Sequence, residues 1–562
     1  MNKKWEFYSQ DTSKVKEIAE KFNISEMLAT VLINRGIIKD DDINLFLNPT
    51  RNDFHDPYLM PDMEKAVTRI IKAIDIHEKT MIYGDYDVDG ITSITVLSKF
   101  LKEQGLDVGY YIPNRLDEGY GLNKDAIKKI AEDGYKLIIT VDCGISGTEE
   151  IEYAYSLGME VIVTDHHEPL EKLPKAVAVI DCKRKDSEYP FNSLAGVGVA
   201  FKLIQAIGIK LKLDEKAYLK YLDIVCIGTI SDIVPLVDEN RVIAKLGLKL
   251  VEQTKSPGVK ALLKAAGYKE INSNTISFGI APRINACGRM GHEEDALKLF
   301  LTENIAEANT ITEKLNNYNK ERQEIEKRIF DEAISKIEND ENKSDSAIIL
   351  ASENWHHGVI GIVSSKITEL YYKPSILVCF EGEDGKGSGR SISGFDLHEA
   401  LCLTNKYLEK YGGHEMAVGL SIKKQNFQKF KDEFEILAKD AHIDEYISVI
   451  NIDKEITLKD LTLENVNSLK LLEPFGEANK NPIFIYKNLK IDSIRALSEG
   501  KHLKLTLKDG NTIINAIGFN MGKYSEEYLI GDKIDVIGLL ETNTFNGIEN
   551  VQINIKDIRK SY

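Results

Sequence analysis

Five short β-rich runs recur about every 20–30 residues between residues 80 and 181, and this spacing constrains the fold more than any other feature. Segments with a helical pattern fill the gaps between the runs. Because strands that alternate with helices form βαβ units, the pattern predicts a parallel sheet with helices on its faces. The runs are TMIYG (80–84), VGYYI (108–112), KLIITV (136–141), EVIVT (160–164) and AVAVI (176–180).

The rest of the chain is expected to form further domains, because its 562 residues exceed what one hydrophobic core supports, roughly 250–300 residues. Apolar side chains at three- and four-residue steps from 311 to 337 predict a long connecting helix, which the polar cluster ENDENKS (338–344) ends. A second α/β domain is expected to start with AIIL (347–350). After about residue 450, short alternating strands and an Asp509-Gly510 turn predict a small β-barrel.

Composition and charge narrow the class of protein. The six cysteines include no Cys-x-x-Cys pair, which argues against a zinc cluster or a disulfide framework and favours a reducing cytoplasm. The first residues are polar and no stretch reaches the ~18 apolar residues of a membrane span, so we expect neither export nor insertion. The net charge of −17 opposes binding to a polyanion, unless some of the acids hold metal cations.

An acidic cluster follows the first β-rich run and precedes a helical segment. The sequence YGDYDVDG carries Asp85, Asp87 and Asp89, whose carboxylates repel one another and call for a neutralising cation. The calcium loop of an EF-hand also begins D-x-D-x-D-G. Here, however, its twelfth residue is Val96 instead of Glu, and a strand precedes the loop where a helix is required. A solvated acidic turn remains the alternative for this motif alone.

Ionisable residues also follow two later runs, with Asp142 after KLIITV and Asp165-His166-His167 after EVIVT. The carboxyl ends of the strands in a doubly wound sheet share one edge, so these side chains are expected to converge. Asp232 is a further candidate, because an unpaired carboxylate among apolar neighbours is costly to bury. Carboxylates and imidazole without cysteine favour Mn²⁺ or Mg²⁺ over zinc, and a pair of such ions suits hydrolysis at phosphorus.

Together these four motifs resemble those of the DHH phosphoesterase superfamily. Within it, the chain is similar over essentially its whole length to the RecJ-type single-stranded-DNA-specific exonucleases. The stretches that carry this likeness are FLNP (46–49), YGDYDVDGITS (83–93), YYIPNRLDEGYGL (110–122), TDHHEP (164–169), APRINACGRM (281–290) and GGHEMAVG (412–419).

The resemblance implies a set of metal ligands and catalytic residues. One ion would be held by Asp89, Asp142, His166 and Asp232, and Asp142 would bridge to a second ion held with Asp87. Asp85 and His167 would each be a ligand or a supporting residue, and His167 would contact or protonate the region of the scissile phosphate. We expect Asp165 to orient His166 or to support the site. The expected metal ligands are Asp85, Asp87, Asp89, Asp142, His166 and Asp232, and the expected catalytic residues are Asp87, Asp89, Asp142, His166, His167 and Asp232.

The later domains carry the expected substrate contacts. GSGRS (387–391) and the Gly-Gly-His of GGHEMAVG resemble the DHH-associated domain, whose glycines allow close approach of a phosphate to the backbone. The terminal domain resembles an OB-fold, with Phe484, Tyr486, Phe519 and Phe545 as base-stacking platforms or, alternatively, core residues. The expected substrate-binding residues are Arg115, Arg289, His357, Ser388, Arg390 and His414.

By this resemblance the chain is an α/β protein with five consecutive parts. They are an N-terminal region packing on the catalytic domain (1–60), a parallel-sheet DHH catalytic domain with a helical extension (61–300), a connecting helix and linker (301–345), a DHH-associated substrate-binding domain (346–445) and an OB-type β-barrel (446–562).

The expected function is 5′-to-3′ exonuclease action on single-stranded DNA, releasing 5′-mononucleotides by two-metal-ion hydrolysis during DNA repair and recombination. The expected partners are a helicase and a single-strand-binding protein, and the chain is expected to be a cytoplasmic monomer. One alternative is another DHH phosphodiesterase, acting on short RNA or cyclic dinucleotides, which the length of the chain disfavours. The other is a non-catalytic DNA-binding scaffold, which the intact carboxylates and His pair disfavour.

Overall fold

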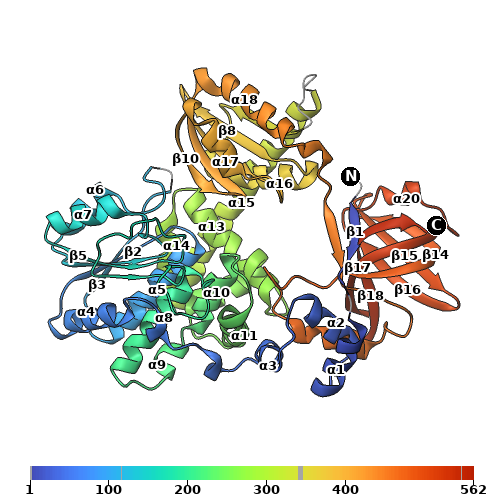
Figure 1. Cartoon of the computed structure of the whole chain (residues 1–562), viewed down its shortest axis with the longest axis horizontal. Helices are drawn as coiled ribbons and strands as arrows, with labels where there is room; N and C mark the ends of the chain where they lie inside the picture. The colour runs from blue at the N-terminus through green and yellow to red at the C-terminus, as the bar shows by residue number, and fades with distance from the viewer. Residues whose placement is uncertain (1–2, 10, 116, 340–345, 546, 562) are drawn as a thin grey trace.

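The computed structural model describes residues 3–9, 11–115, 117–339, 346–545 and 547–561, which form three lobes (Figure 1). Two lobes are α/β units joined by one long helix, and the third is a closed β-barrel, so the predicted fold class is confirmed. The expected ENDENKS boundary falls mostly on residues 340–345, outside the described residues. Within the described ranges, none of the helices combines the length and apolarity that a bilayer span requires.

The first lobe is built on a five-stranded parallel sheet in the order β3-β2-β4-β5-β6. Gly84, Val141 and Thr164, the last residues of β2, β4 and β5, are register partners across the sheet. The residues that follow these three strands therefore emerge at one edge. The strands are β2 (Thr80–Gly84), β3 (Val108–Tyr111), β4 (Leu137–Val141), β5 (Glu160–Thr164) and β6 (Ala178–Ile180).

Helices cover both faces of this sheet because its strands are apolar on both sides. Ile82 faces the core shared with α4 (Met63–Asp75), α5 (Val88–Glu103) and α8 (Gly196–Lys210). Its neighbours Met81 and Tyr83 face the core shared with α6 (Lys124–Glu132) and α7 (Thr148–Ser156). A helical extension follows, with α9 (Lys216–Leu219), α10 (Leu222–Ser231), α11 (Asp238–Glu252), α12 (Pro257–Ala266), the π-helical η3 (Thr275–Ile280), α13 (Ala281–Arg289) and α14 (Glu293–Leu301).

The long helix α15 (Ile305–Asn339) carries the predicted apolar stripe and connects the first two lobes. Near its start, Ile311 and Leu315 pack into the core of the first lobe. Near its end, Ile329, Ala333 and Ile337 pack into the core of the second lobe. One rigid element therefore fixes the second lobe relative to the first.

The second lobe has a mixed five-stranded sheet in the order β10-β11-β9-β8-β7. α16 (His357–Tyr371) covers one face together with α15, and α17 (Leu397–Leu403) and α18 (Phe427–Asp440) cover the other. The strands are β7 (Ile348–Ser352), β8 (Ser375–Glu381), β9 (Asp384–Arg390), β10 (Leu408–His414) and β11 (Ala417–Lys423).

The third lobe is a barrel that pairing between β14 and β17 closes. The predicted turn at Asp509-Gly510 connects two of its antiparallel strands. Phe484 and Tyr486 are buried in the barrel core, so the stacking role considered for them is wrong. Phe519 is exposed, and the side chain of Phe545 lies outside the described residues. The strands are β14 (Phe484–Leu497), β15 (His502–Asp509), β16 (Thr512–Gly518), β17 (Lys533–Phe545) and β18 (Ile548–Lys560).

The N-terminal helices share the hydrophobic core of the barrel, which corrects the expectation that residues 1–60 pack on the catalytic domain as far as Leu47. The end of that region agrees with the expectation, because Phe54, Tyr58 and Met60 pack into the core of the first lobe. Apolar side chains of α1 (Thr12–Phe22), α2 (Glu26–Asn34) and α3 (Asp40–Leu47) join the barrel core. Strand β1 (Lys4–Phe7) pairs in parallel with β12 (Val449–Ile452) beside the barrel (Figure 1). An amphipathic helix shows which of its faces is buried, but its sequence does not show against which domain.

A buried arginine in α11 joins the first lobe to the barrel. The Arg241 guanidinium donates to the carbonyl oxygens of Phe46 at 2.6 Å, Leu472 at 3.0 Å, Leu471 at 3.2 Å and Glu473 at 3.0 Å. Its guanidinium carbon lies 3.5 Å from the centre of the Phe46 ring. Burial lowers the pKa of Arg241 to about 9, which leaves it charged at neutral pH. This side chain therefore ties three segments of the chain together.

Candidate active site

The acidic cluster after β2 is shaped by the start of α5. Asp87 caps this helix, and its Oδ1 atom accepts hydrogen bonds from the main-chain N–H groups of Asp89 at 2.8 Å and Gly90 at 3.1 Å. A Cβ atom at Gly90 would lie 2.4 Å from the carbonyl oxygen of Asp85, so only glycine fits there. The turn thus brings Asp85, Asp87 and Asp89 to the carboxyl edge of the sheet.

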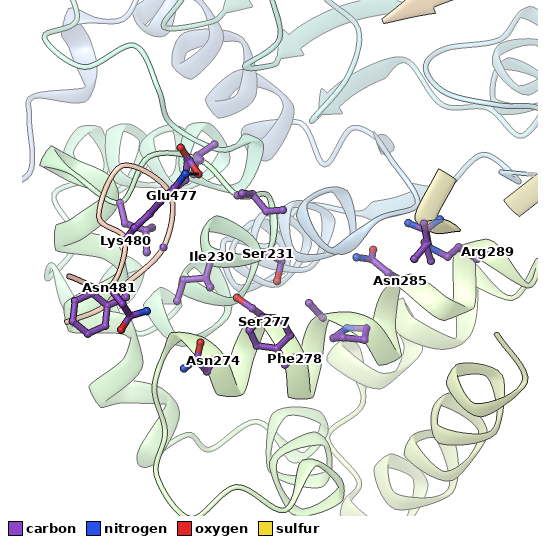
Figure 2. A pocket seen from close by; sticks show the side chains of 18 of the residues that line it. Ile230, Ser231, Asn274, Ser277, Phe278, Asn285, Arg289, Glu477, Lys480 and Asn481 are labelled. Carbon is purple, nitrogen blue, oxygen red and sulfur yellow. Dashed lines mark ion pairs between the residues drawn. The ribbon is translucent and has the colours of Figure 1, made fainter. Parts of the chain in front are cut away.

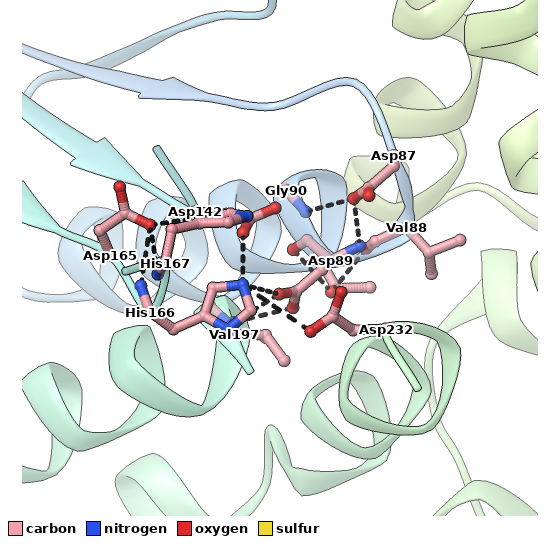
Figure 3. A network of polar contacts seen from close by, with 12 residues as sticks. Asp87, Val88, Asp89, Gly90, Asp142, Asp165, His166, His167, Val197 and Asp232 are labelled. Atoms are coloured by element: carbon pink, nitrogen blue, oxygen red, sulfur yellow. Dashed lines mark hydrogen bonds and ion pairs between the residues drawn. The ribbon is translucent and has the colours of Figure 1, made fainter. Parts of the chain in front are cut away.

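His166 lies at the centre of a group of carboxylates from three other elements. Its Nε2 atom is 3.2 Å from Oδ1 of Asp142, 3.7 Å from Oδ2 of Asp232 and 3.8 Å from Oδ2 of Asp89 (Figure 3). Among the described residues, this buried Nε2 atom has no hydrogen-bond partner. Burial and the neighbouring His167 lower the pKa of His166 to about 3, so the imidazole is neutral. A neutral imidazole nitrogen is the form that binds a metal.

The position of Asp89 depends on the amino end of α8. Its two carboxylate oxygens accept hydrogen bonds from the main-chain N–H groups of Gly196 at 2.6 Å and Val197 at 2.9 Å. The amino end of a helix attracts negative charge. Burial and the charge of Asp87 nevertheless raise the pKa of Asp89 to about 7.

The remaining carboxylates repel one another inside the protein. Burial and neighbouring aspartates raise the pKa of Asp85, Asp142 and Asp232 well above the usual range. The Oδ1 atom of Asp85 is buried and, within the described residues, has no hydrogen-bond partner. Three donor groups arise among the described residues, each with donor atoms within 4.8 Å of one another. They are Asp89, His166 and Asp232; Asp85, Asp87 and Asp142; and Asp142, His166 and His167.

These donors fit a divalent cation. Bound positive charge would offset the repulsion that raises the carboxylate pKa values, and the orphaned atoms of His166 and Asp85 would gain a partner. Oxygen and imidazole donors suit Mn²⁺ or Mg²⁺. Cys143 lies nearby, but burial raises its pKa, so it stays a thiol and a poor ligand.

Asp165 supports the two histidines that follow it. Its Oδ1 atom accepts from the main-chain N–H of His166 at 2.8 Å and lies 2.7 Å from Nδ1 of His167, while Oδ2 accepts from the N–H of Ile145 at 2.9 Å. Burial would raise the pKa of Asp165, but these partners outweigh it and lower the pKa. Asp165 therefore holds the main chain at Ile145 and His166 and the ring of His167.

The structure brings the predicted cationic residues together around the amino end of α16. Arg289 is buried and donates to the carbonyl oxygen of Gly358 at 2.8 Å. Burial and the positive charges of Arg115, Arg322 and Arg390 lower the pKa of Arg289 to about 9. Arg390 donates to Oγ of Ser388 at 3.1 Å. Arg115 stacks on Tyr86, 4.8 Å from the ring centre.

The two predicted histidines of the second lobe lie apart from each other. His357 begins α16, and its buried Nε2 atom has no hydrogen-bond partner among the described residues. His414 is exposed at the end of β10, opposite Ala417, which is itself opposite Arg390. His414 therefore lies in the same cross-strand row as Arg390.

Sequence reasoning missed three contributors to this site. The main-chain donors of Gly196 and Val197 begin a glycine-containing helix, and that glycine pattern was the available signal. Lys183 follows β6 closely, and its charge acts on the pKa of His166 and Asp232. Tyr120 contacts the site from a loop with no periodic pattern.

Comparison with known proteins identifies the domains in the order that the fold shows. The DHH family, N-terminal domain, matches residues 79–229, the DHHA1 domain matches 344–440, and the RecJ OB domain matches 452–557.

Full-length relatives match most of the chain. The single-stranded-DNA-specific exonuclease RecJ of Bacillus subtilis is 39% identical over 560 residues, which cover 99% of this chain and 70% of that protein. The Escherichia coli protein of the same name is 32% identical, over 88% of this chain and 90% of its own length. The crystal structure of Thermus thermophilus RecJ with Mn²⁺ matches with a TM-score of 0.87 and 30% identity, covering 100% of this chain and 80% of that one. The sequence identities, the domain order and the metal-binding geometry agree, and the chain belongs to the RecJ family of single-stranded-DNA-specific exonucleases.

Proposed function

We propose that this protein removes nucleotides one at a time from the 5′ end of single-stranded DNA. The observation that carries the proposal is the convergence of Asp89, Asp142 and Asp232 on the Nε2 atom of His166 in a chain of this family. The cationic residues around α16, beside this acidic cluster, support recognition of a terminal phosphate. They offset locally the overall charge of −17.

We assign two of the donor groups, those without His167, to two divalent ions. Asp89, Asp142, His166 and Asp232 would hold one, and Asp85, Asp87 and Asp142 would hold the other, with Asp142 shared. When bound, such ions supply positive charge and Lewis-acid polarisation of the phosphodiester. The aspartates place that charge at the carboxyl edge of the sheet.

The chemistry follows from which bond must break to release a 5′-mononucleotide. Water attacks the phosphorus atom between the first two nucleotides, and the bond from that phosphorus to the 3′ oxygen of the first nucleotide breaks. The departing 3′ oxygen takes a proton, and the shortened strand again begins with a 5′-phosphate. We assign the scissile phosphate to Nε2 of His167, and the contact between Nδ1 of the same ring and Asp165 supports this assignment.

The terminal 5′-phosphate is assigned to Arg115, Ser388 and Arg390, with His357, Arg289 and His414 around them. Arginine donates two parallel hydrogen bonds to phosphate oxygens, which gives both affinity and orientation. Gly361 of α16 lies next to Ser388 and Arg390. A Cβ atom at position 361 would be 2.9 Å from Oγ of Ser388 and 3.3 Å from the Arg390 guanidinium. A larger residue at position 361 would displace both phosphate contacts.

The strand beyond the scissile phosphate is assigned to a cavity of about 700 Å³ between the catalytic lobe and the barrel. It begins beside Asp232, at Ser231 and Ile233. Figure 2 shows the helical residues Phe278 and Asn285 on one side and the loop residues Glu477, Lys480 and Asn481 on another. Phe278 is 69% exposed and offers a face on which a base can stack. The cavity extends from the two neighbours of Asp232 to the loop that precedes the barrel.

In the cell, we place this activity in DNA repair and recombination. We expect a monomer in the cytoplasm that degrades strands opened by a helicase and covered by a single-strand-binding protein. Family membership supports this role, and the six free cysteines suit a reducing compartment.

The deciding experiment compares 5′-labelled and 3′-labelled single strands, their duplex and a dinucleotide in the presence of Mn²⁺. We expect immediate release of labelled mononucleotide from the 5′-labelled strand and little degradation of the duplex. Asp142→Ala should abolish hydrolysis, whereas Asp133→Asn, an exposed change at the end of α6, should not. Initial release of the 3′ label would overturn the assigned polarity.

A further inference from the structure

Tyr120 lies in the loop between β3 and α6, and its two neighbours turn the chain sharply around it. Gly119 has a φ angle of 82° and Gly121 a φ angle of 90°, in the left-handed region that favours glycine. A Cβ atom on either glycine would meet no atom within 4 Å, so backbone conformation, and not crowding, calls for glycine. The turn directs the Tyr120 side chain toward the active site.

Hydrogen bonds hold this loop on both sides of Tyr120. The Tyr111 hydroxyl donates to Oε1 of Glu118 at 2.7 Å, and the Tyr83 hydroxyl donates to the carbonyl oxygen of Gly121 at 3.0 Å. The main-chain N–H of Asn114 donates to Oε2 of Glu118 at 2.6 Å. The loop is thus anchored independently of the contacts that Tyr120 itself makes.

The Tyr120 hydroxyl contacts two residues of the active site. It donates to the carbonyl oxygen of Asp142 at 3.1 Å, and its oxygen lies 3.0 Å from Nδ1 of His167. The rings of Tyr120 and His167 meet edge to face, with centres 5.5 Å apart. The ring of Tyr120 is partly exposed, whereas its hydroxyl points inward.

The positions of the hydrogens on the Tyr120 hydroxyl and the His167 ring follow from the groups that can only accept. The carboxylate of Asp165 can only accept, and its Oδ1 atom is 2.7 Å from Nδ1 of His167, so Nδ1 carries a hydrogen. The Tyr120 oxygen then faces this N–H with a lone pair, and the hydroxyl hydrogen goes to the Asp142 carbonyl. One hydroxyl therefore connects Asp142 with the ring of His167.

Asp142 needs such support because of its backbone conformation. Its φ angle is 57°, in the left-handed region that residues with a Cβ atom rarely adopt. In this conformation its carboxylate lies 3.2 Å from Nε2 of His166. Gly196 packs closely behind, since a Cβ atom there would be 2.7 Å from the Cβ atom of Asp142. A small rotation of the Asp142 main chain would therefore move a shared metal ligand.

We propose that Tyr120 is a positioning residue, whose hydroxyl fixes the Asp142 main chain and the His167 ring relative to each other. It thereby sets the distance between the metal-holding carboxylates and the imidazole that faces the substrate. This role rests on the function proposed above. It belongs to the hydroxyl and not to the ring, which separates it from base stacking.

The test is Tyr120→Phe, which keeps the ring and removes only the hydroxyl. Loss of one partly buried hydrogen bond at a catalytic group should lower kcat about tenfold. KM for a 5′-phosphorylated single strand should stay within about twofold. The affinity for Mn²⁺, measured by titration calorimetry without DNA, should fall by roughly tenfold. Tyr111→Phe is the matched control, because it removes a hydroxyl that anchors the same loop without contacting Asp142 or His167.

Each outcome decides the matter. Unchanged kcat and Mn²⁺ affinity in Tyr120→Phe would overturn the proposal, and so would equal losses in Tyr111→Phe, which would show that loop anchoring is responsible. If Tyr120→Phe leaves kcat and Mn²⁺ affinity unchanged and Tyr120→Leu raises KM, the ring of Tyr120 stacks on a base and the positioning role is wrong. If the wild-type protein binds Mn²⁺ but hydrolyses no single strand, the proposed function fails, while the calorimetry still tests the positioning role.

Discussion

Asp232→Asn should make the metal-free protein more stable and the enzyme inactive. Asp232 ends α10 with its carboxylate 3.7 Å from Nε2 of His166, close to Asp89. Within the described part of the chain, no hydrogen-bond donor binds this carboxylate, so an asparagine of nearly the same shape removes a charge and breaks no hydrogen bond. The effect of Asp232→Asn on stability therefore measures the repulsion between the Asp232 carboxylate and the neighbouring carboxylates of the metal site.

The magnitude follows from the separation of the charges. Donor atoms of Asp89 and Asp232 lie within 4.8 Å of each other. Two unit charges ~4.8 Å apart repel by about 3.5 kcal/mol at an effective dielectric constant near 20. Because the pKa of Asp89 is raised to about 7, this carboxyl is partly protonated at neutral pH and the repulsion is partly relieved. We expect the free energy of unfolding to rise by about 1–3 kcal/mol.

The pH dependence has a definite sign. A carboxyl group with a raised pKa binds its proton more tightly in the folded protein, so its contribution to stability is complete at low pH. That contribution is lost as the pH rises through the folded pKa, which is about 7 for Asp89. The advantage of Asp232→Asn over the wild type should therefore grow between about pH 4 and pH 8.

The assay is thermal unfolding at pH 8, in EDTA and then in saturating Mn²⁺. In EDTA, the Tm of the catalytic lobe should rise by about 2–4 °C for each kcal/mol gained. Mn²⁺ should stabilise the wild type by roughly 3 kcal/mol at a hundredfold excess over Kd, and the variant much less. Asp133→Asn is the control. An apo Tm at or below that of the wild type, or a full Mn²⁺ shift in the variant, would refute the reasoning.

Three further changes test other parts of the structure. Arg390→Gln removes a charged donor to the proposed 5′-phosphate, so kcat/KM should fall about ten- to a hundredfold on 5′-phosphorylated strands and stay unchanged on 5′-hydroxyl strands. An equal loss on both substrates would contradict the assignment of Arg390 to the 5′-phosphate. Phe278→Ala removes a stacking face worth ~1–3 kcal/mol per base, so KM should rise at least about fivefold for a 20-nucleotide strand and not for a dinucleotide. Arg241→Met leaves buried carbonyl groups unpaired and should lower the free energy of unfolding by about 3–5 kcal/mol. Calorimetry should show this loss, and proteolysis between the catalytic lobe and the barrel should become faster. An unchanged Tm would refute the role of Arg241 in joining the two lobes.

The convergence of the acidic motifs was predictable because it depends only on strand order and direction. The runs before Asp85, Asp142 and Asp165 are mostly apolar, as expected of strands buried on both faces, and parallel pairing aligns their ends. The structure agrees with the expected difference between two neighbouring residues. The ring of His166 faces the carboxylates, whereas the carboxylate of Asp165 accepts from the main chain next to it. Their chemical roles stay predictions.

Other features had no sequence signal of comparable strength. Arg241 is one charge in an amphipathic helix, where a solvent-facing position is the usual expectation, yet it is fully buried against main-chain carbonyls of distant segments. Tyr120 belongs to a loop whose conformation depends on two glycines and on long-range hydrogen bonds. The apolar faces of the N-terminal helices predict burial, but the choice of the barrel as their partner is a property of the assembled fold.

The shared core of the N-terminal helices and the barrel has a consequence for synthesis on the ribosome. Side chains such as Leu28 and Leu32 are buried with residues as distant as Ile555 and Ile558, so their partners emerge about 500 residues later. At about 5–20 residues per second, the helices wait roughly 25–100 s before that core can form. During this interval the catalytic lobe can fold, while the first apolar surface to leave the ribosome remains a target for chaperones.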